Sequence, residues 1–573
     1  MIYPLDECKK KIVSEIKKAI SKYGGEVKLE TPPEDMGDFA FPCFPLASTI
    51  KKSPKNIADN IATTIQKNKW ITKIETNGGY VNFYLDKNYL ISETLNLIFE
   101  MKEEYGHLQK KNKKIIIEHT SANPNGPLHV GRARNPIIGD TLVRIFKASG
   151  YNVESQFYLD DMGKQVAILT WGINNIDPKN IPKTDYDKSD HKSVGFYQEA
   201  NKLMEKNKKI TTEIGEIIKK LENGESKTID LVHKAYASVL DGINESLNRI
   251  NIQIDTYIPE SNFVKDKSVE KVTSGLKKTT YCFEENGAYY LDLESFGVQG
   301  RSTKFFLLRK DGTKLYATRD IAYHQWKAKQ ADILINVLGE DHKLESKQVE
   351  IALKLLDTKT LPKVVFYAFV SLPEGKMSTR KARVVYLDDL IAECIERAYK
   401  EVKKRRGAEL SEQQMKDISE VVGIGSLRYN IIKVQPEKDI VFKWEEALNF
   451  EGNAVPFIQY AHARACSILS KVKDMKREFD STILSHVSEI TLIKQLARFP
   501  LIIEDASNEC KPHIIANYLY ETASKFNQFY RDCPVLPEKN RILRNSRISL
   551  VDGTRIVLKN ALELLGISAP EEM

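Results

Sequence analysis

Residues 114–150, which read KIIIEHTSANPNGPLHVGRARNPIIGDTLVRIFKASG, decide the fold of this chain. The opening KIIIE is a short apolar run of the kind that forms a buried strand. Apolar residues then recur at helical spacing, at Ile138, Leu142, Ile145 and Phe146. Gly150 follows where a glycine commonly ends a helix. The sequence therefore predicts a strand, a loop and a helix in that order.

The loop between this strand and this helix suits a nucleotide. Gly126 and Gly131 lack a Cβ atom, so the backbone can come close to a ligand. The first amides of the following helix, strengthened by the helix dipole, form an anion site. His129 adds a donor that could stabilise negative charge on a bound phosphate. We therefore expect a phosphate-bearing ligand such as a nucleotide to bind at this loop.

The composition is typical of a water-soluble protein with several domains. The 573 residues suffice for about three to four domains. No apolar run reaches the roughly 18 residues that a membrane helix needs, and the N-terminus has no secretory pattern. We therefore expect a cytoplasmic protein with no membrane partner.

The seven cysteines lie far apart and include no Cys-x-x-Cys pair. This spacing argues against a disulfide framework and against a structural zinc site. We predict reduced, mostly buried thiols and no metal site.

The net charge of +8 is compatible with a polyanionic partner. Lysine-rich runs such as 110–114 and 403–406 are, however, more often exposed linkers than nucleic-acid contacts. Charge alone leaves both interpretations open.

Sequence patterns divide the chain into three regions. Residues 1–108 open with an amphipathic helix and close with a strand and a helix, which predicts an N-terminal α+β domain. Residues 109–440 alternate strands and helices, which predicts an α/β catalytic domain with a Rossmann-like parallel sheet. Residues 441–573 lose the strand signals, so we expect a C-terminal α-helical bundle.

The middle region has internal detail of its own. Further strands are expected at 333–337 and 364–370. A Lys/Glu-rich helical insertion is expected at about 165–280, as a surface excursion between two halves of the sheet.

Two separated segments resemble the nucleotide-binding signatures of class I aminoacyl-tRNA synthetases. The first, at 118–135, closely resembles the signature region of arginyl-tRNA synthetases, and the second is KMSTR at 376–380. Arg132 departs from the family pattern because a second histidine is usual there. Thr379 departs as well, since many class I synthetases have a second lysine at that position.

The resemblance implies roles in ATP binding and adenylate formation. A mobile cationic loop suits the departing pyrophosphate, and we expect Arg380 or Lys381 to supply the charge of the missing lysine. Residues 339–342 follow an expected strand, at the sheet edge where ligands bind. The implied ATP-binding residues are Asn125, Gly126, His129, Gly131, Arg132, Gly339, Asp341, Lys376, Met377 and Ser378. The implied catalytic residues are His129, Gly131, Arg132, Lys376 and Ser378.

Arginine selection needs carboxylates that can hold a planar guanidinium. Residues 316–320 resemble the Tyr-x-Thr-Arg-Asp stretch whose Tyr and Asp line the family's arginine pocket. Without the family, Asp320 beside Arg319 is equally well explained as a local surface ion pair. Residues 158–165 also resemble a family segment, with Asp160 where asparagine is usual. The implied arginine-binding residues are Glu118, Ser121, Asn123, Tyr316, Asp320 and His342.

Both ends of the chain resemble tRNA-binding modules of the same family. Residues 451–464 and 518–530 are similar to its helical anticodon-binding domain, although most of their aromatic side chains are expected in the core. The N-terminal region, with its segments 37–40 and 79–83, resembles the family's additional domain, which contacts the tRNA elbow, although its charged surface could equally serve only packing.

The resemblance implies an arginine–tRNA ligase. Such an enzyme activates L-arginine with ATP and Mg²⁺ and transfers it to tRNA(Arg), and the family expectation is a monomer. Two alternatives stay open: a small-molecule nucleotidyltransferase, which would need no anticodon bundle, and a degenerate relative that binds tRNA without charging it.

Overall fold

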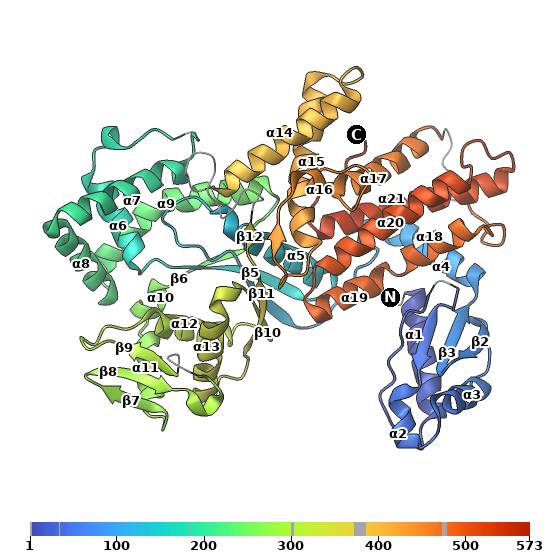
Figure 1. The fold of residues 1–573 in the computed structure, drawn as a ribbon, viewed down its shortest axis with the longest axis horizontal. Helices are drawn as coiled ribbons and strands as arrows, with labels where there is room; N and C mark the ends of the chain where they lie inside the picture. The colour runs from blue at the N-terminus through green and yellow to red at the C-terminus, as the bar shows by residue number, and fades with distance from the viewer. Residues whose placement is uncertain (1–2, 34, 185, 300–302, 372–384, 473–477) are drawn as a thin grey trace.

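The computed structural model describes residues 3–33, 35–184, 186–299, 303–371, 385–472 and 478–573. At its centre lies a five-stranded sheet with the order β11-β10-β4-β5-β6 and parallel neighbours throughout (Figure 1). Its strands are β4 (Lys114–Glu118), β5 (Asn152–Leu159), β6 (Thr256–Pro259), β10 (Ile333–Gly339) and β11 (Pro362–Tyr367). The predicted α/β class is confirmed.

Helix α5 (Arg134–Ala148) covers the centre of this sheet. Ile138, Leu142 and Phe146 of its predicted apolar stripe are buried in one cluster with Ile115 and Ile117 of β4, and Ile145 is buried in the main core. Gly150 follows with φ 85°, and a Cβ there would lie 2.2 Å from the carbonyl oxygen of Gln109. The predicted strand, loop and helix are therefore present, with glycine required at the end of the helix.

The strand expected at 364–370 is split in two. β11 ends at Tyr367, and Val370–Ser371 forms β12, which pairs with β13 (Ile440–Val441). At the break, Ala368 N–H donates to Pro436 O at 2.9 Å, and Ala368 O accepts from Arg134 Nη1 at 2.8 Å. These contacts with distant segments end the strand earlier than its apolar pattern predicts.

Four helices form a body at the left of Figure 1, which we call the α6–α9 body. They are α6 (Lys164–Asn175), α7 (Ser189–Lys206), α8 (Lys208–Glu222) and α9 (Ser226–Arg249). β6 also lies within the stretch expected to be an insertion, yet it pairs with β5 as the edge strand of the sheet. That part of the stretch belongs to the sheet.

A smaller antiparallel sheet and several helices lie between β6 and the end of the parallel sheet. These elements are α10 (Ser261–Lys265), α11 (Ser268–Lys277), β7 (Cys282–Glu285), β8 (Ala288–Asp292), β9 (Lys304–Leu308), α12 (Tyr316–Lys327) and α13 (Lys343–Leu355). α12 lies against the central sheet, where the Tyr323 hydroxyl donates to Gln156 Oε1 of β5 at 3.0 Å.

The N-terminal region is an α+β unit with a three-stranded antiparallel sheet of order β1-β3-β2. Ile12, Ile16 and Ile20 are buried in its core, as the helical spacing predicts. Its elements are α1 (Pro4–Ala19), β1 (Phe39–Pro42), α2 (Ala47–Ile50), α3 (Pro54–Thr64), β2 (Ile71–Asn77), β3 (Tyr80–Leu85) and α4 (Lys87–Met101).

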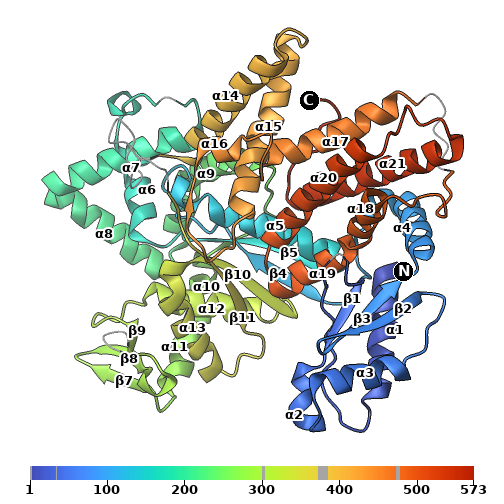
Figure 2. The same cartoon turned by 45° about the vertical axis from the view of Figure 1, so that its right-hand side comes forward.

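The C-terminal region is helical, as predicted. The hairpin of α14 (Leu387–Arg406) and α15 (Glu412–Ile432) projects from the molecule beside it (Figure 2). The other helices are α16 (Trp444–Ala447), α17 (Val455–Ser470), α18 (Val487–Ala497), α19 (Phe499–Glu509), α20 (His513–Asp532) and α21 (Arg541–Leu564).

Helix α4 joins the two ends of the sequence. Its Leu95 and Ile98 share a core with α18 and α21. A Cβ on Gly553 of α21 would lie 3.0 Å from Leu95 Cδ2, so glycine permits the close approach. Beyond α4, Asn560 Nδ2 donates to Tyr105 O at 3.0 Å. The N-terminal unit is thereby fastened to the C-terminal helices.

Candidate active site

The loop after β4 is strained at the carboxyl edge of the sheet. Thr120 and Ser121 have φ values of 72° and 27°, in the left-handed region that residues other than glycine avoid. Thr120 N–H donates to Asn135 Oδ1 at 2.6 Å, and Ser121 Oγ accepts from Tyr158 N–H at 3.1 Å. Such strain persists only where neighbours enforce it, and it is concentrated at functional sites.

Glu118, at the end of β4, has partners within the chain. Its Oε2 lies 2.7 Å from Nζ of the fully buried Lys327 on α12, and its Oε1 accepts from Ser121 Oγ at 3.3 Å. Lys327 Nζ also donates to Asn336 Oδ1 of β10 at 2.8 Å. The Glu118 carboxylate is therefore already paired with a lysine and a serine of the chain.

Asp320, one turn into α12, has histidine and lysine side chains near its carboxylate. Its Oδ1 lies 3.1 Å from Nδ1 of His324. Burial raises the pKa of the Asp320 carboxyl, but His324, Lys327 and His342 outweigh this and hold the pKa below its usual value. Asp320 is therefore ionised at neutral pH and can attract a cation.

Tyr316 begins α12 on the same face as Asp320. Its side chain is 57% exposed, and burial of the hydroxyl together with Glu345 raises its pKa to about 12. Tyr316 thus keeps its proton and remains a donor. Arg319, which precedes Asp320, lies 3.0 Å from Glu260. The ion pair of Arg319 is therefore with Glu260 and not with the neighbouring Asp320.

Glu260, directly after β6, contacts Tyr158 and Arg319 in this region and was not among the residues that the sequence analysis predicted. It is buried; its Oε1 accepts from the Tyr158 hydroxyl at 3.3 Å, and its Oε2 has no hydrogen-bond partner within the described ranges. Burial raises the pKa of Glu260 to about 8, although Arg319 opposes this effect. An acidic residue after a short strand is the only sequence signal for it, and β6 itself is hard to predict.

His129 caps the 3-10 turn Val130–Arg132 that precedes α5. Its Nδ1 accepts from Gly131 N–H at 3.1 Å, so the proton of the neutral ring is on Nε2. Burial and the charge of Arg132 lower the pKa of His129. His129 is therefore a neutral Nε2–H donor, while the Gly131 amide is used within the turn.

The stretch at 339–342 lies near Arg132. Gly339 ends β10, and the 3-10 turn Glu340–His342 follows with Asp341 exposed. A hydrogen bond to Glu345, 3.1 Å from Nδ1, raises the pKa of His342, and Arg132 opposes the shift. The structure therefore brings this predicted stretch and the first signature to one region.

The rest of the signature loop packs on the α6–α9 body. Asn123 and Asn125 each donate from Nδ2 to Gln165 Oε1 at 2.9 Å. A Cβ on Gly126 would lie 2.7 Å from Val194 Cγ2 of α7. The glycine at 126 is thus needed for packing, a reason that the sequence analysis did not give.

The second signature falls within 372–384, outside the described residues, so the roles of Lys376, Met377 and Ser378 stay predictions. The chain after it lies against the first signature. Val130 N–H donates to Val385 O at 3.0 Å, and Leu387 N–H donates to Leu128 O at 2.8 Å.

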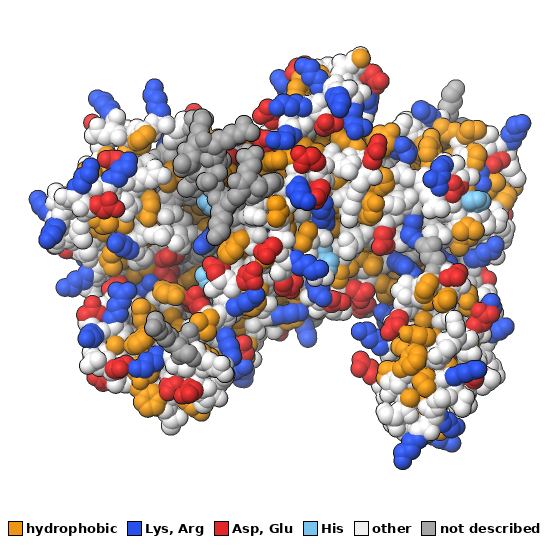
Figure 3. All heavy atoms as spheres, viewed as in Figure 1, with side chains coloured by type: hydrophobic (Ala, Val, Ile, Leu, Met, Phe, Trp, Pro, Cys, Tyr) orange, Lys and Arg blue, Asp and Glu red, His pale blue; other side chains and the backbone are white. Residues whose placement is uncertain are grey.

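A cavity of about 700 Å³ lies between the α14–α15 hairpin and α17. Its aromatic lining includes Phe450 and the 43% exposed Tyr460. The guanidinium of Arg464 lies 4.7 Å from the Tyr460 ring centre, and Arg464 Nη1 donates to Asn527 Oδ1 at 2.7 Å. Lysine and arginine side chains gather on the nearby hairpin (Figure 3). Most other aromatic residues of 518–530 are buried, as expected.

All seven cysteines are free thiols, and five of them are buried. Across the described ranges, no helix combines the length and apolarity needed to cross a bilayer.

Comparison with known families matches all three regions. Residues 94–444 match the model of the class I tRNA synthetase (R) catalytic domain. Residues 6–85 match the arginyl tRNA synthetase N-terminal domain, and residues 458–573 match the DALR anticodon binding domain. The chain belongs to the arginyl-tRNA synthetase family. It is thus a class I aminoacyl-tRNA synthetase, an enzyme of the ligase class, as the sequence resemblance implies.

Relatives within the arginyl-tRNA synthetase family align over nearly the whole chain. The arginine–tRNA ligase of Methanocella arvoryzae is 46% identical over 92% of each chain. That of Methanosarcina barkeri is 42% identical over 99% of this chain and 100% of the relative. The arginyl-tRNA synthetase structure of Thermus thermophilus has a TM-score of 0.85 at 27% identity, covering 98% of this chain and all of that one. The anticodon-domain match weighs against a small-molecule nucleotidyltransferase.

Proposed function

We propose that this arginyl-tRNA synthetase family member activates L-arginine with Mg²⁺-bound ATP and transfers it to tRNA(Arg). The arginine carboxylate attacks the α-phosphorus, so that arginyl-adenylate forms and pyrophosphate leaves. The terminal ribose hydroxyl of the tRNA then attacks the acyl carbon, which releases AMP. The observation that carries the proposal is the Asp320 carboxylate on α12, the helix that Lys327 joins to Glu118 of the first signature at 2.7 Å, in a chain whose relatives are arginine–tRNA ligases.

The guanidinium is assigned to Asp320 and Glu260. Tyr158 lies close to both carboxyl groups, and Glu260 has a buried oxygen with no hydrogen-bond partner among the described residues. Two carboxylates in different directions can bind a planar fork of N–H donors but match an ammonium less well. We assign Ser121, Asn123 and His342 to the amino and carboxylate end of arginine.

The phosphates are assigned to the signature loop and the turn after β10. His129 would donate Nε2–H to the α-phosphate, where a preorganised donor stabilises the growing charge. Arg132 supplies a permanent cation, and Gly339 and Asp341 would contact the nucleotide. Lys376, Met377 and Ser378 complete the proposed ATP set.

The tRNA is assigned to both ends of the chain. In the cavity beside Tyr460 and Arg464, an aromatic ring and a guanidinium plane suit an unstacked base. The N-terminal unit is assigned to the tRNA elbow by family membership. We further propose a cytoplasmic monomer.

Arginine-dependent ATP–pyrophosphate exchange tests the function directly. It would be measured with and without tRNA(Arg), with lysine and citrulline as control amino acids. Exchange with arginine alone supports the proposal, and its dependence on tRNA shows whether activation waits for tRNA. Binding of tRNA without exchange under either condition would indicate the inactive relative instead.

A further inference from the structure

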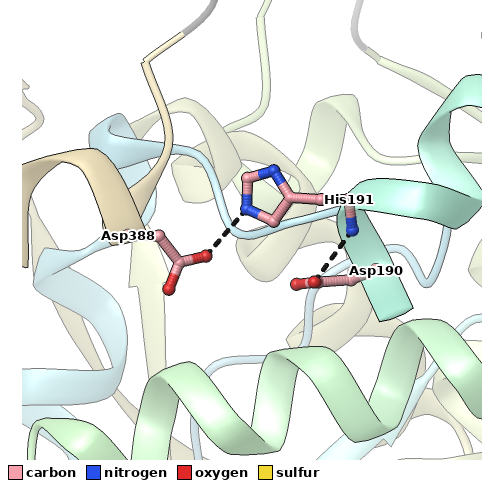
Figure 4. Close-up of side chains that lie close together, drawn as sticks. All are labelled: Asp190, His191 and Asp388. Atoms are coloured by element: carbon pink, nitrogen blue, oxygen red, sulfur yellow. Dashed lines mark hydrogen bonds and ion pairs between the residues drawn. The ribbon is translucent and has the colours of Figure 1, made fainter. Parts of the chain in front are cut away.

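A buried charge cluster joins the α6–α9 body to the start of α14 (Figure 4). Lys188 Nζ lies 2.7 Å from Asp388 Oδ2 and 3.3 Å from Asp190 Oδ2. His191 Nε2 lies 2.9 Å from Asp388 Oδ2, and Ser246 Oγ of α9 donates to Asp388 Oδ1 at 2.8 Å. Each of these residues is at most 7% exposed. We call these five residues the α14 anchor.

The anchor contains its own cation, which weighs against a metal site there. Asp190, His191 and Asp388 are close enough together to hold a cation. Lys188, however, already places its ammonium within 3.3 Å of both carboxylates and donates to Ser246 Oγ at 2.5 Å. A metal ion bound at the same place would be repelled by the Lys188 ammonium.

The anchor lies next to the strand segment that pairs with the first signature. Asp388 is the second residue of α14, and Tyr386, two residues earlier, forms an antiparallel bridge with His129. Asp389 makes a second connection between the same two regions. Its Oδ1 accepts from the Tyr186 hydroxyl at 3.0 Å, and its Oδ2 accepts from Tyr386 N–H at 2.8 Å. The α6–α9 side therefore fixes the backbone opposite His129.

We propose that the α14 anchor positions His129 for adenylate formation. Asp388 and Ser246 act through the backbone at 385–387 and do not touch the substrates, so they are positioning residues. The inference rests on the proposed function, because it assigns His129 to the phosphate. A shift of about 1 Å in a reacting group can cost on the order of a hundredfold in rate, so loosening the anchor should slow activation.

A matched pair of serines on α9 tests this role. Ser246→Ala removes a donor to Asp388, while Ser238→Ala removes the α9–α7 hydrogen bond between Ser238 and Ser193, which are 2.9 Å apart, and leaves α14 untouched. Asp388→Asn removes the central charge. For each full-length variant, kcat and the KM values for arginine and ATP would be measured in the pyrophosphate exchange, together with the melting temperature.

We expect Ser246→Ala and Asp388→Asn to lower kcat by about tenfold or more, with the KM for arginine within about twofold of the wild type. Ser238→Ala should keep the wild-type kcat. The inference is overturned if the first two variants keep kcat, or if Ser238→Ala loses as much. If Asp388→Asn does not fold, Ser246→Ala decides by the same criterion. A wild type without exchange would overturn the proposed function and this inference together. If the wild type is active, the variants test the α14 anchor alone.

Discussion

Lys327 Nζ and Glu118 Oε2 lie 2.7 Å apart in the interior, where they join α12 to β4 beneath the candidate arginine site. Removal of one partner from a buried ion pair leaves the other charge without compensation. We expect Lys327→Met to lower the free energy of unfolding by about 3–5 kcal/mol, measured by urea denaturation. Lys343→Met, which breaks an exposed pair with Glu340, should cost at most about 1 kcal/mol. Equal losses in both variants would contradict the assignment of Lys327 as a structural cation.

Asp320→Ala should abolish arginine activation while the fold is retained. The bound guanidinium would lose an ionised partner, at a cost of several kcal/mol. Pyrophosphate exchange and the melting temperature would be measured together. Asp311→Ala, at an exposed acid before α12, serves as the control. Near-normal exchange by the Asp320 variant would refute the pocket assignment.

The raised pKa of Glu260 predicts a pH dependence. Because burial raises this pKa from 4.5 to about 8, the folded state holds a proton that the unfolded state has lost between these values. The contribution of Glu260 to stability is thus complete below about pH 4.5 and is lost as the pH rises through about 8. Urea denaturation across this range should show that the free energy of unfolding of the wild type falls as the pH rises. This decrease should be missing in Glu260→Gln.

Arginine binding should also depend on the ionisation of Glu260, but binding should improve as the pH rises, whereas stability falls. A cationic substrate favours ionised Glu260, so the KM for arginine should fall as the pH rises from about 6 to about 8. In Glu260→Gln the KM should be higher and should vary less over this range. If the KM for arginine has the same pH dependence in Glu260→Gln as in the wild type, Glu260 does not contact the substrate.

His129 is predicted to act as a neutral donor. His129→Ala should lower kcat for pyrophosphate exchange by on the order of a hundredfold, as expected for loss of one donor to a developing oxyanion. His129→Gln, whose amide can donate from a similar position, should retain more activity. If the two variants are equally impaired, the role of His129 lies in capping the turn at Gly131.

Tyr460→Ala should weaken tRNA use. Stacking of one base contributes about 1–3 kcal/mol, so the KM for tRNA in aminoacylation should rise about tenfold or more. Val487→Ala, at a more exposed side chain of the same domain, should leave this KM unchanged. An unaltered KM in both variants would place the bound base elsewhere.

The sequence predicts best where its signals are local. The strand Lys114–Glu118 and the helix Arg134–Ala148 follow from apolar spacing that their own packing satisfies. The end of β11 depends on Arg134, which is more than two hundred residues away from Ala368, and no local pattern contains that contact. Glu260 escaped prediction for a similar reason, since its raised pKa arises from burial by other segments.

The contact between α4 and α21 can form only late in the synthesis of the chain. The apolar side of α4, including Leu95 and Ile98, is covered by helices that leave the ribosome several hundred residues later. Until α21 is complete, the nascent chain exposes this side to water, which favours aggregation or binding by chaperones. A stop codon between α4 and α18 should therefore leave Leu95 and Ile98 of α4 exposed to water, next to an N-terminal core that lacks only Ala497 of its buried residues.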